Sequence, residues 1–347
     1  MSQTIILTIN KFIFGVLIHY KIFYIEKMII KYLILGNLLL LTACQIKSGS
    51  QSSPRLNKQD PVAIQLQDQI FIFPEIPATL TEPEARKAYL LTHYWDKFDF
   101  ADTTLVNNRD VTEQGFVNFI ALLLDGTTTK ELTGKSLADW CTHFLPYPHS
   151  RQVMTQLTDD YLYNPNSPYY NETLYGMYLE TLLNVLPQTD AMRSSYQFRL
   201  ELLRRNNVGD KATDFTYYLP GGTHRTLAAT PVKNNRLLLV FYDPECESCH
   251  EVLQQMIPDK ALAETVQAGK LSVLAVYTEG NEDAWRKSLP DMPQGWTVGT
   301  DREKVKMGAL YDLKAMPSLY LLDGQKRVIL KDATYETVRR TVMQQEP

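Results

Sequence analysis

Two cysteines, Cys246 and Cys249, are separated by two residues and follow an apolar run, 237–242. Such a run is typical of a buried strand, and the residues after it favour a helix. Two thiols in the first turn of a helix can close a small disulfide. The positive end of the helix dipole also stabilises a thiolate on the first of them. The spacing therefore indicates a redox-active dithiol.

The composition of the chain limits the number of domains and the classes of partner and metal site that it can have. At roughly 150 residues per domain, a chain of 347 residues is expected to hold about two domains. The formal net charge of −4 and the lack of a long basic run argue against a nucleic-acid partner. Four cysteines are too few for a disulfide scaffold of this size, and their layout does not suit a four-thiol zinc site. We therefore expect neither a metal nor a cofactor.

Residues 1–44 form an apolar segment that is interrupted by charged residues, so no uninterrupted stretch reaches the roughly 20 residues needed to cross a bilayer. Counted from Met28, the segment contains a lysine at position 31, an apolar run over 32–41 and then Thr42-Ala43-Cys44. This pattern resembles a bacterial lipoprotein signal, in which the cysteine becomes the lipidated N-terminus. The resemblance implies that translation starts at Met28.

Lipidation of Cys44 would attach the protein to a membrane of the cell envelope, because several acyl chains bind more firmly than one. Gln45 follows without an acidic cluster, which favours the outer membrane and a periplasmic location. The alternative is an uncleaved signal anchor in which Cys44 is incidental.

The following residues predict a tether and a helical domain. Residues 45–62 are rich in Ser, Gln and Lys, as in a flexible linker. Residues 63–206 are predicted to form a domain that begins with an extended segment over 63–73 and continues with five or six helices. Within 112–124, for example, apolar residues recur at three- and four-residue steps; they are Phe116, Phe119, Ile120 and Leu123.

Aromatic residues are dense in this helical half, and we expect most of them to form its core. The alternative is an exposed peptide- or sugar-binding groove. Cys141 is expected to be a buried apolar residue, with a third exchanging thiol as the alternative. Three histidines, His93, His143 and His149, are expected to be structural.

Residues 207–347 predict strands that alternate with helices. Strands are expected over 215–219 and 226–229 around Pro220-Gly221-Gly222, and over 237–242 and 271–277. A second hairpin is expected over 319–322 and 327–330. Helices are expected over 247–257, 282–289, 302–312 and 334–344.

The dithiol segment Phe241–Cys249 and the later run Ala315-Met316-Pro317-Ser318 resemble the thioredoxin-like superfamily. The segment is most similar to its membrane-tethered periplasmic thiol-disulfide oxidoreductases of the TlpA and ResA type, and the resemblance covers residues 207–347. It implies an α/β thioredoxin-like fold. The helical half is similar to an uncharacterised domain that precedes thioredoxin modules in envelope lipoproteins.

The resemblance also implies roles for individual residues. Cys246 would attack a substrate disulfide, and Cys249 would resolve the mixed disulfide. Pro317 would have a cis peptide bond, face the dithiol and present the backbone of Met316 to an extended substrate chain. The implied partners are protein disulfides and an electron donor in the membrane or periplasm.

The residues around the dithiol favour a reductant or isomerase over a primary oxidant. Glu247 places a negative charge beside the thiolate and disfavours ionisation. Ser248 replaces the proline that is common at this position, and Val240 stands where thioredoxin has a buried aspartate. His250 and Glu251 are weak candidates for proton transfer.

Three other functions compete with this interpretation. A peroxiredoxin-like peroxidase needs threonine at position 243, where this chain has Asp243. A thioredoxin-fold copper chaperone needs a histidine later in the chain as a metal ligand, but no histidine follows His250. The third is a binding or assembly lipoprotein in which the helical domain recognises a partner and the thioredoxin module is a scaffold. The intact Cys246, Cys249 and Pro317 argue against it.

Overall fold

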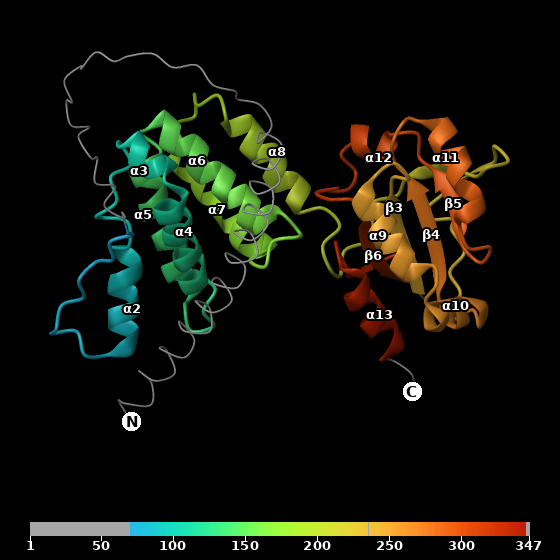
Figure 1. The fold of residues 1–347 in the computed structure, drawn as a ribbon, viewed down its shortest axis with the longest axis horizontal. Helices are drawn as coiled ribbons and strands as arrows, with labels where there is room; N and C mark the ends of the chain where they lie inside the picture. The colour runs from blue at the N-terminus through green and yellow to red at the C-terminus, as the bar shows by residue number, and fades with distance from the viewer. Residues whose placement is uncertain (1–69, 235, 345–347) are drawn as a thin grey trace, which may run out of the picture. The chain divides into compact units, whose positions relative to one another are not determined.

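The computed structural model describes residues 70–234 and 236–344 (Figure 1). The predicted signal segment, Cys44 and the tether therefore lie outside the described residues. All of the described residues belong to one compact unit. Within this unit a helical domain precedes an α/β sheet domain, which confirms the predicted fold class. No helix of the described residues is both long enough and apolar enough to cross a bilayer.

The described part of the helical domain contains seven α-helices and one π-helical turn, against five or six predicted helices. The additional helices include α3, a single short turn with too few residues to show a periodic pattern. Asp102, Thr129 and Asn171 cap helices α3, α5 and α7 by accepting backbone N–H bonds. The elements are α2 (Pro83–Thr92), α3 (Thr103–Asn107), α4 (Arg109–Leu123), α5 (Lys130–Phe144), α6 (Pro148–Thr158), η1 (Asp159–Tyr163), α7 (Glu172–Val185) and α8 (Arg193–Leu203).

The segment before α2 forms no strand over its described residues, 70–82. Instead, Phe71 packs on α4, where Gly115 leaves room for its ring because a Cβ there would overlap the ring atoms. Tyr94 stacks on the same ring at 5.1 Å between centroids, and its hydroxyl donates to the Gly115 carbonyl at 2.9 Å. Side-chain packing thus holds this segment in place.

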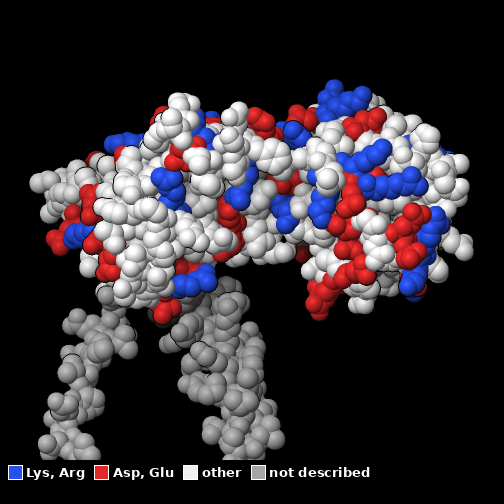
Figure 2. Space-filling view, turned by 90° about the horizontal axis from the view of Figure 1, so that it is seen from above, with Lys and Arg blue, Asp and Glu red and all other residues white. Residues whose placement is uncertain are grey.

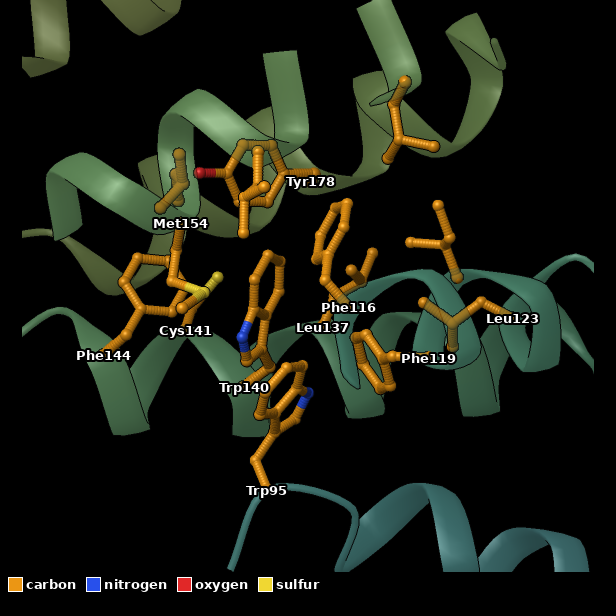
Figure 3. Close-up of a cluster of buried hydrophobic side chains, with 14 of the residues drawn as sticks. Trp95, Phe116, Phe119, Leu123, Leu137, Trp140, Cys141, Phe144, Met154 and Tyr178 are labelled. Atoms are coloured by element: carbon orange, nitrogen blue, oxygen red, sulfur yellow. The ribbon is translucent and has the colours of Figure 1, made fainter. Parts of the chain in front are cut away.

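Aromatic side chains fill the core of the helical domain (Figure 3). Trp140 lies at its centre, with ring centroids 5.9 Å from Trp95, 5.7 Å from Phe119 and 5.7 Å from Tyr178. The four residues of the predicted apolar stripe on α4 are all buried, as expected. Cys141 is also fully buried in this core. These residues therefore have a packing role and line no open groove.

The second domain is a seven-stranded mixed sheet in the order β2-β1-β5-β4-β3-β6-β7. The central strands β3, β4 and β5 are parallel, and the flanking pairs are antiparallel. The predicted hairpins are present as β1–β2 and β6–β7. The strands are β1 (Thr216–Tyr218), β2 (His224–Thr226), β3 (Arg236–Tyr242), β4 (Ser272–Tyr277), β5 (Thr297–Thr300), β6 (Ser318–Asp323) and β7 (Val328–Leu330).

Both faces of the sheet are covered, which explains why β3 is a continuous apolar run. Leu238 and Val240 face a cluster with the helices on one side, and Leu237 and Leu239 face a cluster with residues 212–227 and α12 on the other. Figure 1 shows α9 packed against the sheet. The helical elements are α9 (Glu247–Met256), α10 (Lys260–Gln267), α11 (Glu282–Ser288), η2 (Leu289–Asp291), α12 (Lys304–Met307) and α13 (Tyr335–Met343).

The structure differs from the predictions at four elements of this domain. Strand β5 and helix α10 were not predicted, and β2 lies at His224–Thr226 instead of 226–229. The helix predicted over 302–312 is limited to α12. Arg302, Glu303 and Ala309 have positive φ angles, and this left-handed conformation interrupts a right-handed helix on both sides.

Candidate functional site: a dithiol at the end of the central strand

The two cysteines lie where β3 ends and α9 begins. Cys246 is the N-cap residue of α9, with extended backbone angles, and Cys249 lies in the first turn. The Cys246 carbonyl accepts the N–H of His250 at 3.1 Å, which starts the helix. Since β3 lies between β4 and β6, the thiols occupy the carboxyl end of the sheet's parallel centre, where open α/β sheets commonly bind ligands.

The two thiols differ in accessibility. Cys246 is half-buried, whereas Cys249 is fully buried. Burial raises the pKa of the Cys249 thiol, even though its sulfur accepts the backbone N–H of Asp243 at 3.4 Å. A hydrogen bond with Cys246 raises the same pKa further. Cys246 is therefore the thiol that an outside molecule can reach, and Cys249 is held in the neutral form behind it.

The loop before β6 faces Cys246. Its Met316–Pro317 peptide bond is cis, as the resemblance implies, and the Cys246 sulfur lies 3.9 Å from the Met316 carbonyl oxygen. The sheet register explains this proximity, because Ser318 at the start of β6 pairs with Phe241 near the end of β3. The structure thus brings together all four residues predicted for the dithiol site and its substrate loop.

Asp243 is a further residue of the site, and in the sequence it stands out only as a departure from the peroxidase pattern. Its amide holds Cys249, its negative charge raises the pKa of that thiol, and its carboxylate accepts the Glu245 N–H at 2.9 Å. Glu245 in turn accepts a hydrogen bond from Asn281 at 3.1 Å. The available signal was position, since Asp243 directly follows the buried strand and precedes a proline.

The predicted proton-transfer candidates are less well placed. His250 donates a ring N–H to the Pro244 carbonyl, and Glu251 is exposed. Glu247 and Ser248 are also exposed at the start of α9, where the charge of Glu247 lies next to the accessible thiol. Figure 2 shows that acidic and basic side chains are intermixed on the visible face, so neither sign forms a continuous field there.

Another cysteine and three of the histidines that the sequence offered as functional candidates lie in the helical domain. Cys141 belongs to the helical core and Cys246 to a core cluster of the sheet domain, so Cys141 does not serve as a third thiol of the dithiol site. His93 forms a 2.7 Å hydrogen bond with Asp96, and His149 forms one of 2.8 Å with Asn107. Across 70–234 and 236–344, no group of three or more suitable side chains could hold a metal ion.

Comparison with known proteins agrees with this geometry. A thioredoxin-like domain family matches residues 224–332, and a domain family of unknown function, DUF5106, matches residues 43–206. The fold and the dithiol together define the chain as a thioredoxin-like protein.

The chain is similar to a thioredoxin-like protein from Bacteroides caccae whose crystal structure is known. The two sequences are 33% identical, and the two structures superpose with a TM-score of 0.65. The match covers 80% of this chain and 99% of that one. The chain therefore belongs to the thioredoxin-like family.

Shorter solved structures match only part of the chain. A conserved Bacteroides fragilis protein of unknown function is 39% identical over 39% of this chain and 98% of that one, with a TM-score of 0.37. A domain of a possible thiol-disulfide isomerase from Cytophaga hutchinsonii is 26% identical over 41% of this chain and 94% of that one, with a TM-score of 0.35. No curated protein matches the chain.

Proposed function

We propose that the protein is a thiol-disulfide oxidoreductase that reduces or isomerises protein disulfides through Cys246 and Cys249. One observation carries the proposal. An accessible sulfur at a helix N-terminus lies 3.9 Å from the backbone carbonyl of a cis-proline loop, and a second, buried thiol lies within the same helical turn. This arrangement offers a nucleophile, a resolving thiol and a backbone edge for an extended peptide.

The proposed reaction follows from the accessibility of Cys246 and the burial of Cys249. The Cys246 thiolate attacks one sulfur of a substrate disulfide; a new S–S bond forms, and the leaving sulfur takes a proton. Cys249 then loses its proton, attacks Cys246 and releases the second substrate sulfur as a thiol. Two electrons pass to the substrate, and a Cys246–Cys249 disulfide remains for an electron donor to reduce. Asp243 is the proposed acceptor of the Cys249 proton, because its carboxylate is close enough to raise the pKa of that thiol.

The charges around Cys246 support the reducing direction. Glu245 and Glu247 are exposed acidic residues on either side of Cys246. Strong oxidants of this kind carry groups that stabilise their reduced, thiolate form, and two acidic side chains supply no positive charge that would do so. A site of this composition favours donating electrons to substrates.

The cellular setting of the proposal is that of the TlpA and ResA type: a lipid anchor on Cys44 and a location on the periplasmic side of the envelope, at the outer membrane. It is supported by the sequence pattern Thr42-Ala43-Cys44. Mass spectrometry of the protein purified from membranes should find an N-terminal acylated Cys44. An unmodified N-terminus upstream of Cys44 would refute the anchor and leave the redox proposal intact.

Insulin reduction tests the activity. The full chain should turn over with a dithiol donor, Cys246→Ala should abolish turnover, and Cys141→Ser should retain it. Cys249→Ser should accumulate mixed disulfides, whose captured proteins identify the substrates. If the wild-type chain shows no turnover in either reduction or disulfide exchange, the site is not an oxidoreductase site, and the binding-protein alternative replaces the proposal.

A further inference from the structure

A buried charge cluster lies beside the substrate loop. Lys314, whose side chain is 1% exposed, contacts Asp332 at 2.7 Å, Asp312 at 3.0 Å and Glu172 at 2.7 Å. Lys331, 5% exposed, contacts the other oxygen of Glu172 at 3.1 Å. These five residues are called the Lys314 cluster below. It contains two positive and three negative side chains.

The cluster joins the two domains. Glu172 is the first residue of α7 in the helical domain, and the other four members belong to the sheet domain. Tyr163 of η1 donates to Asp312 at 2.6 Å, and its ring lies 5.3 Å from the Lys314 nitrogen. Lys331 also donates to the Leu203 carbonyl of α8 at 2.8 Å. The helical domain thus supplies both an anion and an aromatic surface to a cation of the sheet domain.

The cluster also fixes the loop on both sides. Lys314 lies two residues before Met316, whose carbonyl faces the Cys246 sulfur at 3.9 Å. Ser318, directly after Pro317, donates to Asp332 at 2.6 Å. Asp332 therefore contacts both flanks of the Met316–Pro317 loop. A shift of Lys314 toward or away from Glu172 would move the loop relative to the dithiol.

Such a cluster resists displacement. Burial alone would lower the pKa of Lys314, but Asp332, Asp312 and Glu172 together raise it well above its usual range. Burial would likewise raise the pKa of Glu172, but Lys314 and Lys331 lower it. Lys314 and Glu172 therefore both stay charged at neutral pH, and removing one partner of a buried charge is costly.

We propose that the helical domain positions the substrate-binding loop of the dithiol site: Glu172, acting through Lys314, holds the Met316–Pro317 backbone at the distance at which an extended peptide can lie beside Cys246. Glu172 and Lys314 are positioning residues and take no part in electron transfer. The inference rests on the proposed function for its effect on activity. It also gives the helical domain a role in the reaction.

The test uses Glu172→Gln in the full chain. This change leaves two cations and two anions in the cluster, so the fold is retained, but the link across the domains is weakened. The matched control is Arg151→Gln, which removes a 2.8 Å ion pair with Asp190 inside the helical domain and touches no residue of the cluster. Both variants lose one charged partner of a partly buried pair.

Three readouts separate positioning from general destabilisation. Glu172→Gln should raise KM for insulin roughly two- to thirtyfold. It should leave unchanged the rate with a small aromatic disulfide, which needs no peptide-binding backbone. It should also speed amide hydrogen exchange at residues 313–316. Arg151→Gln should change neither the insulin KM nor exchange in that loop.

If Glu172→Gln matches Arg151→Gln in insulin KM and in exchange at residues 313–316, the inference is overturned while the proposed function stands. If the wild-type chain reduces no disulfide, the proposed function fails, and the exchange comparison alone decides whether Glu172 holds the loop. Equal losses with insulin and with the small disulfide would also overturn the inference, because they indicate damage to the dithiol itself.

Discussion

Cys141 of the helical domain and Cys246 of the sheet domain differ in accessibility, although one lies on a helix and the other at a helix start. Cys141 lies near the end of the 15-residue helix α5, on the face that packs against the aromatic core. Cys246 lies at the N-cap of α9, half-buried. Burial raises the pKa of Cys141 well above that of an ordinary thiol. Helix position and packing, more than residue type, determine which thiol can react.

The domains also differ in their most buried ion pairs, although both have exposed pairs. Ion pairs within the helical domain, such as Arg204 with Glu180 at 2.5 Å, include well-exposed ones. The sheet domain buries Lys314 and Asp312 almost completely. Exposed pairs contribute little to stability, whereas loss of one partner from a buried pair costs much more. The structurally sensitive charges therefore lie beside the dithiol site.

Thiol alkylation gives the largest contrast between the domains. Under native conditions iodoacetamide should modify Cys246 faster than Cys141 by a factor on the order of a hundred or more, because Cys141 reacts only after local unfolding. Mass spectrometry of peptides quenched over time measures both rates. In denaturant the two rates should converge. Equal native rates would show that the helical core opens readily, and the contrast would not hold.

Replacement of the buried cation should have the next largest effect. Lys314→Met leaves Asp312 and Asp332 buried without their main counter-ion and should lower the free energy of unfolding by about 3–5 kcal/mol. Urea denaturation measures it. The control is Lys306→Met, since Lys306 forms an exposed 2.8 Å pair with Glu279 and its loss should cost about 0–1 kcal/mol. Similar losses for both variants would show that the buried carboxylates of the Lys314 cluster do not depend on Lys314.

A pH series should separate two aspartates, one from each domain. Asp301, fully buried after β5, accepts the Val305 N–H at 2.6 Å. Burial raises its pKa to about 6. Its stabilising contribution is therefore complete below its unfolded pKa and is lost as pH rises through 6, which amounts to about 3 kcal/mol between pH 4 and 7. Asp301→Asn should remove that loss.

Asp190 in the helical domain should show the reverse trend. The Met192 N–H and Arg151 lower its pKa, so its contribution is present at neutral pH and is lost as pH falls through the lowered value. Asp190→Asn should flatten the acid side of the stability curve, measured by urea denaturation at each pH. If the two variants have parallel curves, the environments assigned to these carboxylates are wrong.

Helix caps should give the smallest contrast. Thr129 caps α5 and Thr334 caps α13, each by accepting a backbone N–H. Replacement of either by alanine should cost about 1 kcal/mol. Hydrogen exchange should locate the loss in α5 for Thr129→Ala and in α13 for Thr334→Ala. Loss of protection in both domains from one substitution would show that they unfold as a single unit.

The long elements of the fold were predictable because their patterns are local. The apolar run of β3, the stripe on α4 and the turn residues between β1 and β2 each indicate their structure directly. Strand β5, Thr297–Thr300, is short and contains a glycine, so it shows no strand pattern. Helix α10 had a usable signal in its cap, Asp259, which accepts two backbone N–H bonds.

The part of the site that has a local sequence pattern was also predictable. The spacing of Cys246 and Cys249 predicted the dithiol, and the resemblance to the thioredoxin-like superfamily predicted the role of Pro317. The Lys314 cluster could not be found this way, because Glu172 is separated from Lys314 by 142 residues. A lysine between apolar residues gives no indication of its partners. The left-handed backbone at Arg302 and Glu303 was not predictable either, because neither position has the glycine that usually indicates this conformation.

The fit of Phe71 over Gly115 determines where a shortened chain can begin. A fragment that starts at Pro83, the first residue of the first described helix, would lack this ring and leave an aromatic-sized hole over α4. Water or a neighbouring side chain would enter the gap beside Tyr94. A fragment intended for crystallisation or spectroscopy should therefore begin upstream of residue 70.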